Sequence, residues 1–287
     1  MLCGGLIVQG IVTAILLYVL FRRPSSRSAP SARALIVSGG VVLPVATLTA
    51  LLAYSLPATQ RLRAAEREIS VDIEVVGRRW WWEVRYLDAE GTPEFRTANE
   101  LYLPLGEAIR VRVTSADVIH SFWVPSLAGK IDLIPGHENA VILEPTSTGT
   151  FRGQCAEYCG TQHANMALDV VTVAPGEFQA WRLRQKQAAT QPTGPAELMG
   201  HDVFMRAGCA LCHTVRGTPA SGSFGPDLTH LGSRRTIAAG ALPMNRGTLA
   251  AWILSAQHIK PDNLMPSFNT LSGEELQALV LYLESLK

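Results

Sequence analysis

The hydrophobic pattern of this chain begins with two long uncharged apolar runs, residues 6–21 and 34–56. A helix needs about 20 apolar residues to cross the core of a bilayer. The two runs therefore predict a transmembrane helical hairpin at the start of the chain. The first run can also be read as a signal peptide, but no basic segment precedes it and no clear cleavage site follows it.

After residue 68 the pattern changes to strict alternation. Ile69, Val71, Ile73 and Val75 alternate with polar residues, and the same period returns at 109–113, 140–144 and 167–173. Alternation is typical of half-buried strands, and several short strands between Gly and Pro turns predict a β-sandwich or barrel.

The remainder of the chain is predicted to be helical. The segment GEFQAWRLRQKQ has a helical pattern, AATQPTGPA is typical of an exposed linker, and SGEE marks Ser272 as the N-cap of a terminal helix. We therefore divide the chain into a hairpin with its connecting segment (1–68), an all-β domain (69–180), a linker (181–195) and an all-α domain (196–287).

Composition narrows the chemistry. The 287 residues carry a formal net charge of only +1 and no lysine-rich run, so nothing favours nucleic acid as a partner. The five cysteines consist of Cys3 and two closely spaced pairs. In a chain of this size, paired spacing indicates metal or cofactor attachment rather than a disulfide framework.

The first pair lies in RGQCAEYCGTQHANM, where Cys155, Cys159, His163 and Met166 could reach one point from a single loop. Thiolate, imidazole and thioether are the ligands of copper electron-transfer sites, whereas zinc seldom binds methionine. Two cysteines suggest two coppers that share both thiolates, and such a site needs a second histidine. His120, in SADVIHSFWVP, is the candidate.

These motifs, together with TANELYLPLG and KIDLIPG, resemble subunit II of the haem-copper cytochrome c oxidases. The resemblance covers roughly residues 6–175 and implies a cupredoxin-like sandwich with a binuclear copper centre, CuA, behind a two-helix anchor. The ligands that it implies are His120, Cys155, Cys159, His163 and Met166, with the backbone carbonyl of Glu157 as a weak sixth ligand.

The same resemblance implies two further roles. The Glu157 side chain would reach a magnesium ion shared with subunit I, and Trp80, in RRWWWEVRY, matches the tryptophan through which electrons reach the copper pair. The family usually has a glutamine where this chain has Arg79. On an alternating strand, three consecutive tryptophans face both sides, so at least one is expected to be exposed or interfacial.

The second cysteine pair lies in AGCALCHT, where Cys209, Cys212 and His213 form the Cys-x-x-Cys-His signature of covalent haem attachment. A thioredoxin-like redox pair is the usual rival, but the strand that should precede it is missing. Met265, in NLMPSF, is the expected second axial ligand, with Met244 as its competitor.

Residues 196–287 resemble class I cytochrome c domains. That resemblance implies that Pro226 orients the haem histidine and that Trp252 packs beside the haem. Covalent haem of this kind is attached on the outer side of the bacterial membrane. Both soluble domains are therefore expected there, with the arginine-bearing loop between the two apolar runs inside.

Together these features predict an electron-transfer subunit of a proton-pumping cytochrome-c oxidase in the bacterial inner membrane. Electrons would pass from a cytochrome c or a donor respiratory complex through haem c and CuA to an oxygen-reducing subunit I, which would assemble with other oxidase subunits. Three alternatives are weighed. A copper-containing nitric oxide reductase subunit would look alike, quinol-oxidising relatives lack the copper ligands found here, and a copper-delivery protein leaves Met166 and the haem motif unexplained.

Overall fold

Apolar helices form the first part of the chain. In the computed structural model of the protein, which describes residues 2–21, 32–64 and 68–287, helix α1 spans Leu2–Phe21. It is followed by α2 (Ala32–Val37), the π-helical segment η1 (Ser38–Val42) and α3 (Leu43–Ala64). The chain divides into two compact units, Met1–Glu66 and Arg67–Lys287.

Within the described residues, one stretch, Ser38–Pro57, is long and apolar enough to cross a membrane. The other apolar helical stretch, Gly5–Phe21, is shorter. The structure thus supports one membrane-spanning helix of the predicted hairpin. The predicted orientation used the arginines between the two apolar runs. Residues 22–31, which contain most of that loop, lie outside the described residues.

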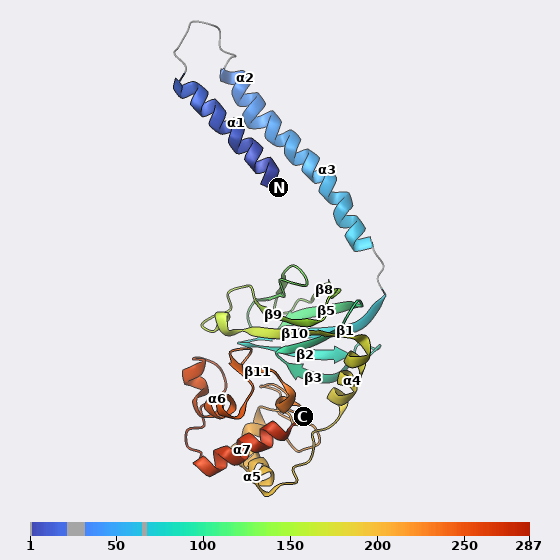
Figure 1. Cartoon of the computed structure of the whole chain (residues 1–287), viewed down its shortest axis with the longest axis vertical. Helices are drawn as coiled ribbons and strands as arrows, with labels where there is room; N and C mark the ends of the chain where they lie inside the picture. The colour runs from blue at the N-terminus through green and yellow to red at the C-terminus, as the bar shows by residue number, and fades with distance from the viewer. Residues whose placement is uncertain (1, 22–31, 65–67) are drawn as a thin grey trace. The chain divides into compact units, whose positions relative to one another are not determined.

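Alternating sequence folds into two five-stranded sheets, which confirms the predicted sandwich (Figure 1). The first sheet contains, in spatial order, β3 (Pro93–Ala98), β2 (Trp81–Leu87), β1 (Ile69–Arg78), β5 (Ala108–Ser115) and β8 (Asn139–Leu143). The second contains β4 (Glu100–Pro104), β10 (Ala167–Val173), β9 (Gly149–Cys155), β6 (His120–Trp123) and β7 (Ile131–Leu133). β1 and β5 run parallel, as do β4 and β10, while the other pairs are antiparallel.

The inward-facing residues of both sheets form one apolar core. In β5, for example, Ile109, Val111 and Val113 are fully buried while the residues between them are partly exposed, as the period of two requires. Helix α4 (Pro175–Lys186) packs onto the same domain, because Trp181 stacks on Tyr102 with ring centroids 4.4 Å apart. This helix crosses the predicted domain boundary at residue 180.

The C-terminal part is helical and has its own core. It contains α5 (Pro195–Arg206), α6 (Arg246–Ile259) and α7 (Gly273–Ser285), with the short helices η3 (Cys209–Leu211) and η4 (Leu231–Ser233) and the small ribbon β11 (Thr236–Ile237) and β12 (Leu242–Pro243). Helices α5 and α7 cross closely because a side chain at Gly200 would collide with the carbonyl of Ala278. Ser272 caps α7 as predicted, with its side chain accepting a hydrogen bond from the Glu275 amide.

The β-domain and the helical domain contact each other within the unit Arg67–Lys287. The Ala167 amide donates to the carbonyl of Ala239, and the Arg235 amide donates to the carboxylate of Glu100. The segment between the domains is mostly exposed, as predicted, but Ala189 is buried and its amide donates to the carbonyl of Arg216.

Candidate metal and haem centres

Strand pairing brings the first copper-ligand candidates together. His120 begins β6 and Cys155 ends β9, and the two strands are neighbours, with Phe122 opposite Cys155. The Nδ1 atom of His120 lies 3.9 Å from the Sγ atom of Cys155. His120 is fully buried and Cys155 is 4% exposed. Two residues far apart in sequence thus meet inside the sandwich.

The loop after β9 supplies the other candidates. Cys159 Sγ lies 3.8 Å from Cys155 Sγ, 3.7 Å from His163 Nδ1 and 3.9 Å from Met166 Sδ. The ligand atoms of His120, Cys155 and Cys159 all lie within 4.8 Å of one another. The structure therefore brings together all five side chains that the sequence singled out.

Hydrogen bonding determines which nitrogen of His120 faces the sulfurs. Its Nε2 lies 2.8 Å from Oδ1 of Asp117. The same oxygen accepts from the backbone amide of Val118, and the other carboxylate oxygen accepts from the amide of Arg79. Since Nε2–H donates to Asp117, Nδ1 is left with a free lone pair toward Cys155. Sequence reasoning missed Asp117, although its spacing of three from His120 was the available signal.

Glu157 lies between the two cysteines and presents only its backbone to the cluster. Its carbonyl oxygen is 3.1 Å from Cys155 Sγ, while its side chain is exposed. The neighbouring Tyr158 is 75% exposed. The loop therefore turns a carbonyl inward and an acidic and an aromatic side chain outward.

The hydrogen bond between the two sulfurs favours a thiolate at Cys155 and a thiol at Cys159. The Cys159 thiol lowers the pKa of Cys155 against the effect of burial, whereas the same bond and burial raise the pKa of Cys159. Thiolate, imidazole and thioether around one buried point form a soft donor set of the kind that copper prefers. By the chemistry of its donors, the cluster fits copper.

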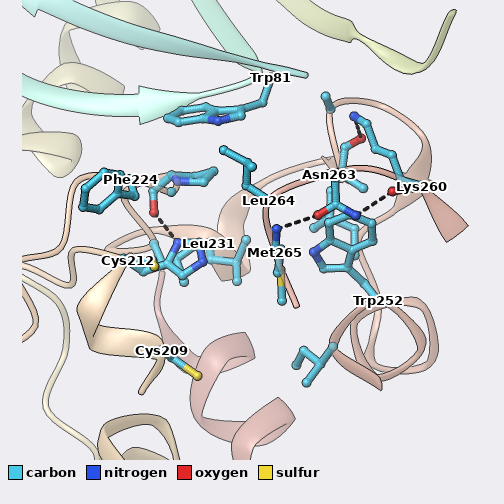
Figure 2. Close-up of a pocket in the computed structure, with 18 of the residues that line it drawn as sticks. Trp81, Cys209, Cys212, Phe224, Leu231, Trp252, Lys260, Asn263, Leu264 and Met265 are labelled. Atoms are coloured by element: carbon cyan, nitrogen blue, oxygen red, sulfur yellow. Dashed lines mark hydrogen bonds between the residues drawn. The ribbon is translucent and has the colours of Figure 1, made fainter. Parts of the chain in front are cut away.

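A second constellation surrounds a cavity of about 420 Å³, shown in Figure 2, which is lined mainly by the helical domain and also by residues of the β-domain. Its size lies within the ~300–1,000 Å³ of typical ligand pockets. The Cys-x-x-Cys-His residues line it together with the predicted haem neighbours; the predicted residues among them are Cys209, Cys212, His213, Pro226, Trp252 and Met265. Met244 packs against the helical core and is not among the lining residues.

The histidine of this cavity is set up as a metal ligand. The Nδ1 atom of His213 lies 2.7 Å from the carbonyl oxygen of Pro226, so Nδ1–H donates and Nε2 stays available for a metal. Burial lowers the pKa of His213 and keeps the imidazole neutral. Backbone comes close to this ring, because a Cβ at Gly225 would lie 2.6 Å from His213 Cε1.

One cation at the cavity was missed by sequence reasoning. Arg234 lines the cavity, and its Nε atom is buried without a hydrogen-bond partner. Burial lowers its pKa, because the charged form loses water. A guanidinium with a spare donor suits a carboxylate group on a cavity ligand, and haem carries two such groups. No motif spacing in the sequence distinguished Arg234 from its neighbour Arg235.

Trp80 touches both constellations. It lines the cavity, is 6% exposed, and donates its Nε1–H to the carbonyl oxygen of Cys159 over 2.9 Å. Trp81 also lines the cavity and lies above it in Figure 2, partly exposed, whereas Trp82 is fully buried in the sandwich. The expectation that at least one of the three is interfacial is confirmed.

Comparisons with known proteins match each domain separately. The family model for the periplasmic domain of cytochrome c oxidase subunit II matches residues 91–173, and the cytochrome c model matches residues 198–287. Cytochrome c oxidase subunit 2 of Bacillus subtilis is 32% identical over 257 residues, covering 86% of this chain and 70% of that protein. The chain belongs to the cytochrome c oxidase subunit II family.

Other members of the family are also similar. The subunit 2 of Alkalihalophilus pseudofirmus is 39% identical over 218 residues, which is 76% of this chain and 62% of that protein. The chain thus spans 62% to 70% of the length of these two relatives. The solved periplasmic domain of subunit II of cytochrome oxidase from Bradyrhizobium japonicum is 34% identical, with 42% of this chain and 95% of that chain covered and a TM-score of 0.39.

The two matched families imply two cofactors. A cytochrome c oxidase subunit II domain implies the CuA copper pair, and a cytochrome c domain implies haem c. The soft-donor cluster lies in the β-domain, and the cavity is lined mainly by the helical domain, with Trp80 and Trp81 of the β-domain among its lining residues. The donor chemistry of each site fits the group that its family implies.

Proposed function

We propose that this chain is the electron-transfer subunit of a membrane terminal oxidase that acts as a cytochrome-c oxidase. It passes electrons from a cytochrome c donor, through its own haem c and CuA, to the oxygen-reducing subunit I. The observation that carries the proposal is the position of Trp80, which lines the haem cavity and hydrogen-bonds to the carbonyl of Cys159 in the copper cluster. A single side chain thus connects the two predicted redox sites.

The proposed ligands follow the geometry described above. The thiolates of Cys155 and Cys159 would hold the copper pair, together with the imidazoles of His120 and His163. The full proposed copper set is His120, Cys155, Cys159, His163, Met166 and the carbonyl of Glu157. When bound, the pair accepts and releases one electron without a proton.

Haem c would be attached through thioether bonds to Cys209 and Cys212, and His213 would offer Nε2 to the iron. Met265 would offer its thioether as the second protein ligand, because it lines the cavity whereas Met244 does not. Arg234 would offer its unpaired Nε–H to a haem carboxylate. Trp252, which also lines the cavity, would pack beside the haem.

The proposed partners are subunit I and further oxidase subunits, which bind beside a bacterial inner membrane that the chain crosses twice. Residues 2–21 would form the other span, ahead of Ser38–Pro57 in the chain, and the soluble unit would lie on the outer side. The exposed side chains of Glu157 and Tyr158, on the copper loop, support this surface as the one that meets subunit I. There Glu157 would contribute to a shared magnesium site.

Burial argues against the copper-delivery alternative. A delivery protein must hand its ion to a partner, yet Cys155, Cys159 and Met166 are at most 4% exposed and His120 is fully buried. Such a site retains its metal. A copper-delivery role would also leave unexplained the cavity that Trp80 and the Cys-x-x-Cys-His residues line.

The proposed path is tested by Trp80→Phe in the purified chain with both cofactors bound. Phenylalanine keeps an aromatic ring but lacks the Nε1–H that bonds to Cys159, so the haem and copper spectra should be unchanged while flash-induced transfer from haem to copper slows. Trp81→Phe is the matched control, since Trp81 lines the same cavity and its indole has no hydrogen bond to the copper loop. Equal rates in both variants would refute the path.

The assignment to an oxidase is tested on membranes. The chain should co-purify with a many-helix subunit that carries two further haems, and the complex should consume oxygen when reduced cytochrome c is supplied. The copper of the complex should give the seven-line hyperfine pattern of a mixed-valence pair. A four-line signal of a single copper, or reduction of nitric oxide in place of oxygen, would contradict the assignment.

A further inference from the structure

A lysine of the helical domain is buried where that domain contacts the β-domain. Lys260 follows the last residue of α6 and is only 3% exposed, and no acidic side chain pairs with it among the described residues. An ammonium group loses much hydration energy when it is buried, so such a group is kept only where its hydrogen bonds are replaced.

Three backbone carbonyls replace them. The Nζ atom of Lys260 lies 2.7 Å from the carbonyl oxygen of Trp80, 2.7 Å from that of Asn165 and 3.1 Å from that of Ala238. Burial lowers the pKa of Lys260 to about 7. In its ammonium form the group has three N–H donors, and each donor has one acceptor. Two of these carbonyls belong to the β-domain and one to the helical domain. The ammonium is therefore satisfied only when the two domains adopt this one arrangement.

The two β-domain carbonyls belong to the copper site's own surroundings. Asn165 directly precedes Met166 in the loop, and Trp80 donates its Nε1–H to the carbonyl of Cys159. Lys260 thus donates hydrogen bonds to two backbone carbonyls of the β-domain that lie beside predicted copper ligands.

On the other side, Lys260 is joined to the predicted axial methionine. The Asn263 side-chain amide donates to the Lys260 carbonyl over 2.6 Å, and its Oδ1 accepts from the Met265 amide over 2.7 Å, as the dashed lines in Figure 2 show. Hydrogen bonds, joined by the covalent bonds of Asn263, Lys260 and Trp80, therefore link Met265 to Cys159.

We propose that Lys260 is a positioning residue for electron transfer between the two domains: its ammonium holds the haem-binding domain in one docked arrangement against Trp80 and the copper loop. The proposal rests on the proposed function, because it concerns the rate at which one electron passes from ferrous haem to the oxidised copper pair. That step oxidises the iron by one electron, reduces the pair by one electron, and moves no proton. Lys260 touches neither metal and acts through Trp80 and Asn165.

The test compares Lys260→Met with Lys130→Met in the full chain with haem and copper bound. Methionine keeps an unbranched apolar chain as far as Cε but lacks Nζ, so it leaves three carbonyls without a donor, whereas Lys130 is exposed. Two readouts are needed. Hydrogen exchange of the Ala167 and Arg235 amides reports docking, because both donate across the interface. Flash-induced haem-to-copper transfer reports the functional consequence.

In Lys260→Met the hydrogens of these two amides should exchange about tenfold faster or more, because several buried acceptors lose their partner. Haem-to-copper electron transfer should slow by a similar factor. The haem absorption and copper resonance spectra should stay unchanged, as should all readouts in Lys130→Met. Lys260→Gln, which keeps two donors, should show a smaller effect in the same direction, and it decides the question if Lys260→Met does not fold.

Wild-type exchange and transfer rates in a Lys260 variant that retains both spectra would overturn the proposal. Slower transfer with unchanged exchange would also overturn it, since Lys260 would then act through its charge and not through docking. Failure of the unsubstituted chain to bind haem or the copper pair is a different result, and it would count against the proposed function instead.

Discussion

The His120 imidazole and the Asp117 carboxylate form a 2.8 Å hydrogen bond that leaves the other ring nitrogen of His120 facing Cys155. His213 shows the reverse arrangement, in which Nδ1 is bonded to the carbonyl of Pro226 and Nε2 is free. Each histidine thus has one nitrogen engaged by the protein and one available to a metal. The acceptor beside each ring decides which nitrogen that is.

Asp117→Asn should weaken copper binding about 10- to 100-fold, because an amide holds the ring less firmly than a carboxylate and makes His120 a poorer donor. Copper content after competition with a chelator measures the effect. Asp202→Asn is the matched control, since Asp202 lies 3.7 Å from the Nδ1 of His201 but its side chain is 76% exposed and His201 is not a predicted copper ligand. Equal copper loss in both variants would contradict a role for Asp117.

Two glycines permit close approach of backbone to the two histidines, and they allow the sites to be disturbed separately. A Cβ at Gly77 would lie 2.7 Å from His120 Cδ2, and one at Gly225 would lie 2.6 Å from His213 Cε1. Gly77→Ala should therefore alter the copper spectrum and spare the haem spectrum, and Gly225→Ala should do the opposite. Gly129→Ala, with no atom within 4 Å of the added Cβ, should alter neither. A reversed pattern would show that these contacts do not shape the sites.

The axial ligand is tested by Met265→Ala. Loss of the thioether, which favours Fe(II), should lower the haem reduction potential by a fraction of the ~0.8 V range that axial ligands span. Redox titration of the haem absorption measures it, and the copper spectrum should not change. Met244→Ala is the control, because Met244 packs outside the cavity lining. A lower potential in Met244→Ala alone would reverse the assignment.

Glu83 links stability to pH. Burial raises the pKa of its carboxyl, but hydrogen bonds and charges from Arg85 and Arg78 outweigh burial and hold the pKa below its usual 4.5. An acid whose pKa is lower in the folded state stabilises the fold above the unfolded-state pKa, and that contribution is lost as the pH falls through the folded-state value.

Glu83→Gln should therefore lower the free energy of unfolding at pH 7 by about 1–3 kcal/mol, because it removes the charge that accepts from the partly buried Arg78 and Arg85, and Arg85 keeps Glu74 as a partner. The difference from the unsubstituted protein should shrink as the pH falls below 4.5. Denaturant unfolding of the copper-free chain at both pH values measures it, with the exposed Glu90→Gln as control. An equal loss at pH 7 and at low pH would mean that the charge of Glu83 contributes nothing.

The sequence by itself determined the strands, the ligand types and the haem signature, because each of these is a local property. Alternation from Ile69 onward follows from the two-residue period of a strand, and β1 begins at that residue. Cys155, Cys159, His163 and Met166 lie close enough along the chain for one loop to bring them together. Spacing alone was therefore sufficient to predict that these four side chains could meet.

Only the tertiary structure decided how the two predicted redox sites meet. His120 reaches the cysteines through the pairing of β6 with β9, and Lys260 reaches Trp80 across 180 positions of sequence. Neither contact follows from a local sequence pattern, because a buried ammonium or imidazole obtains its partners from whichever groups the fold brings within range. Lys260 is an unremarkable residue after a helix in the sequence. In the folded unit its three donors are satisfied by both domains at once.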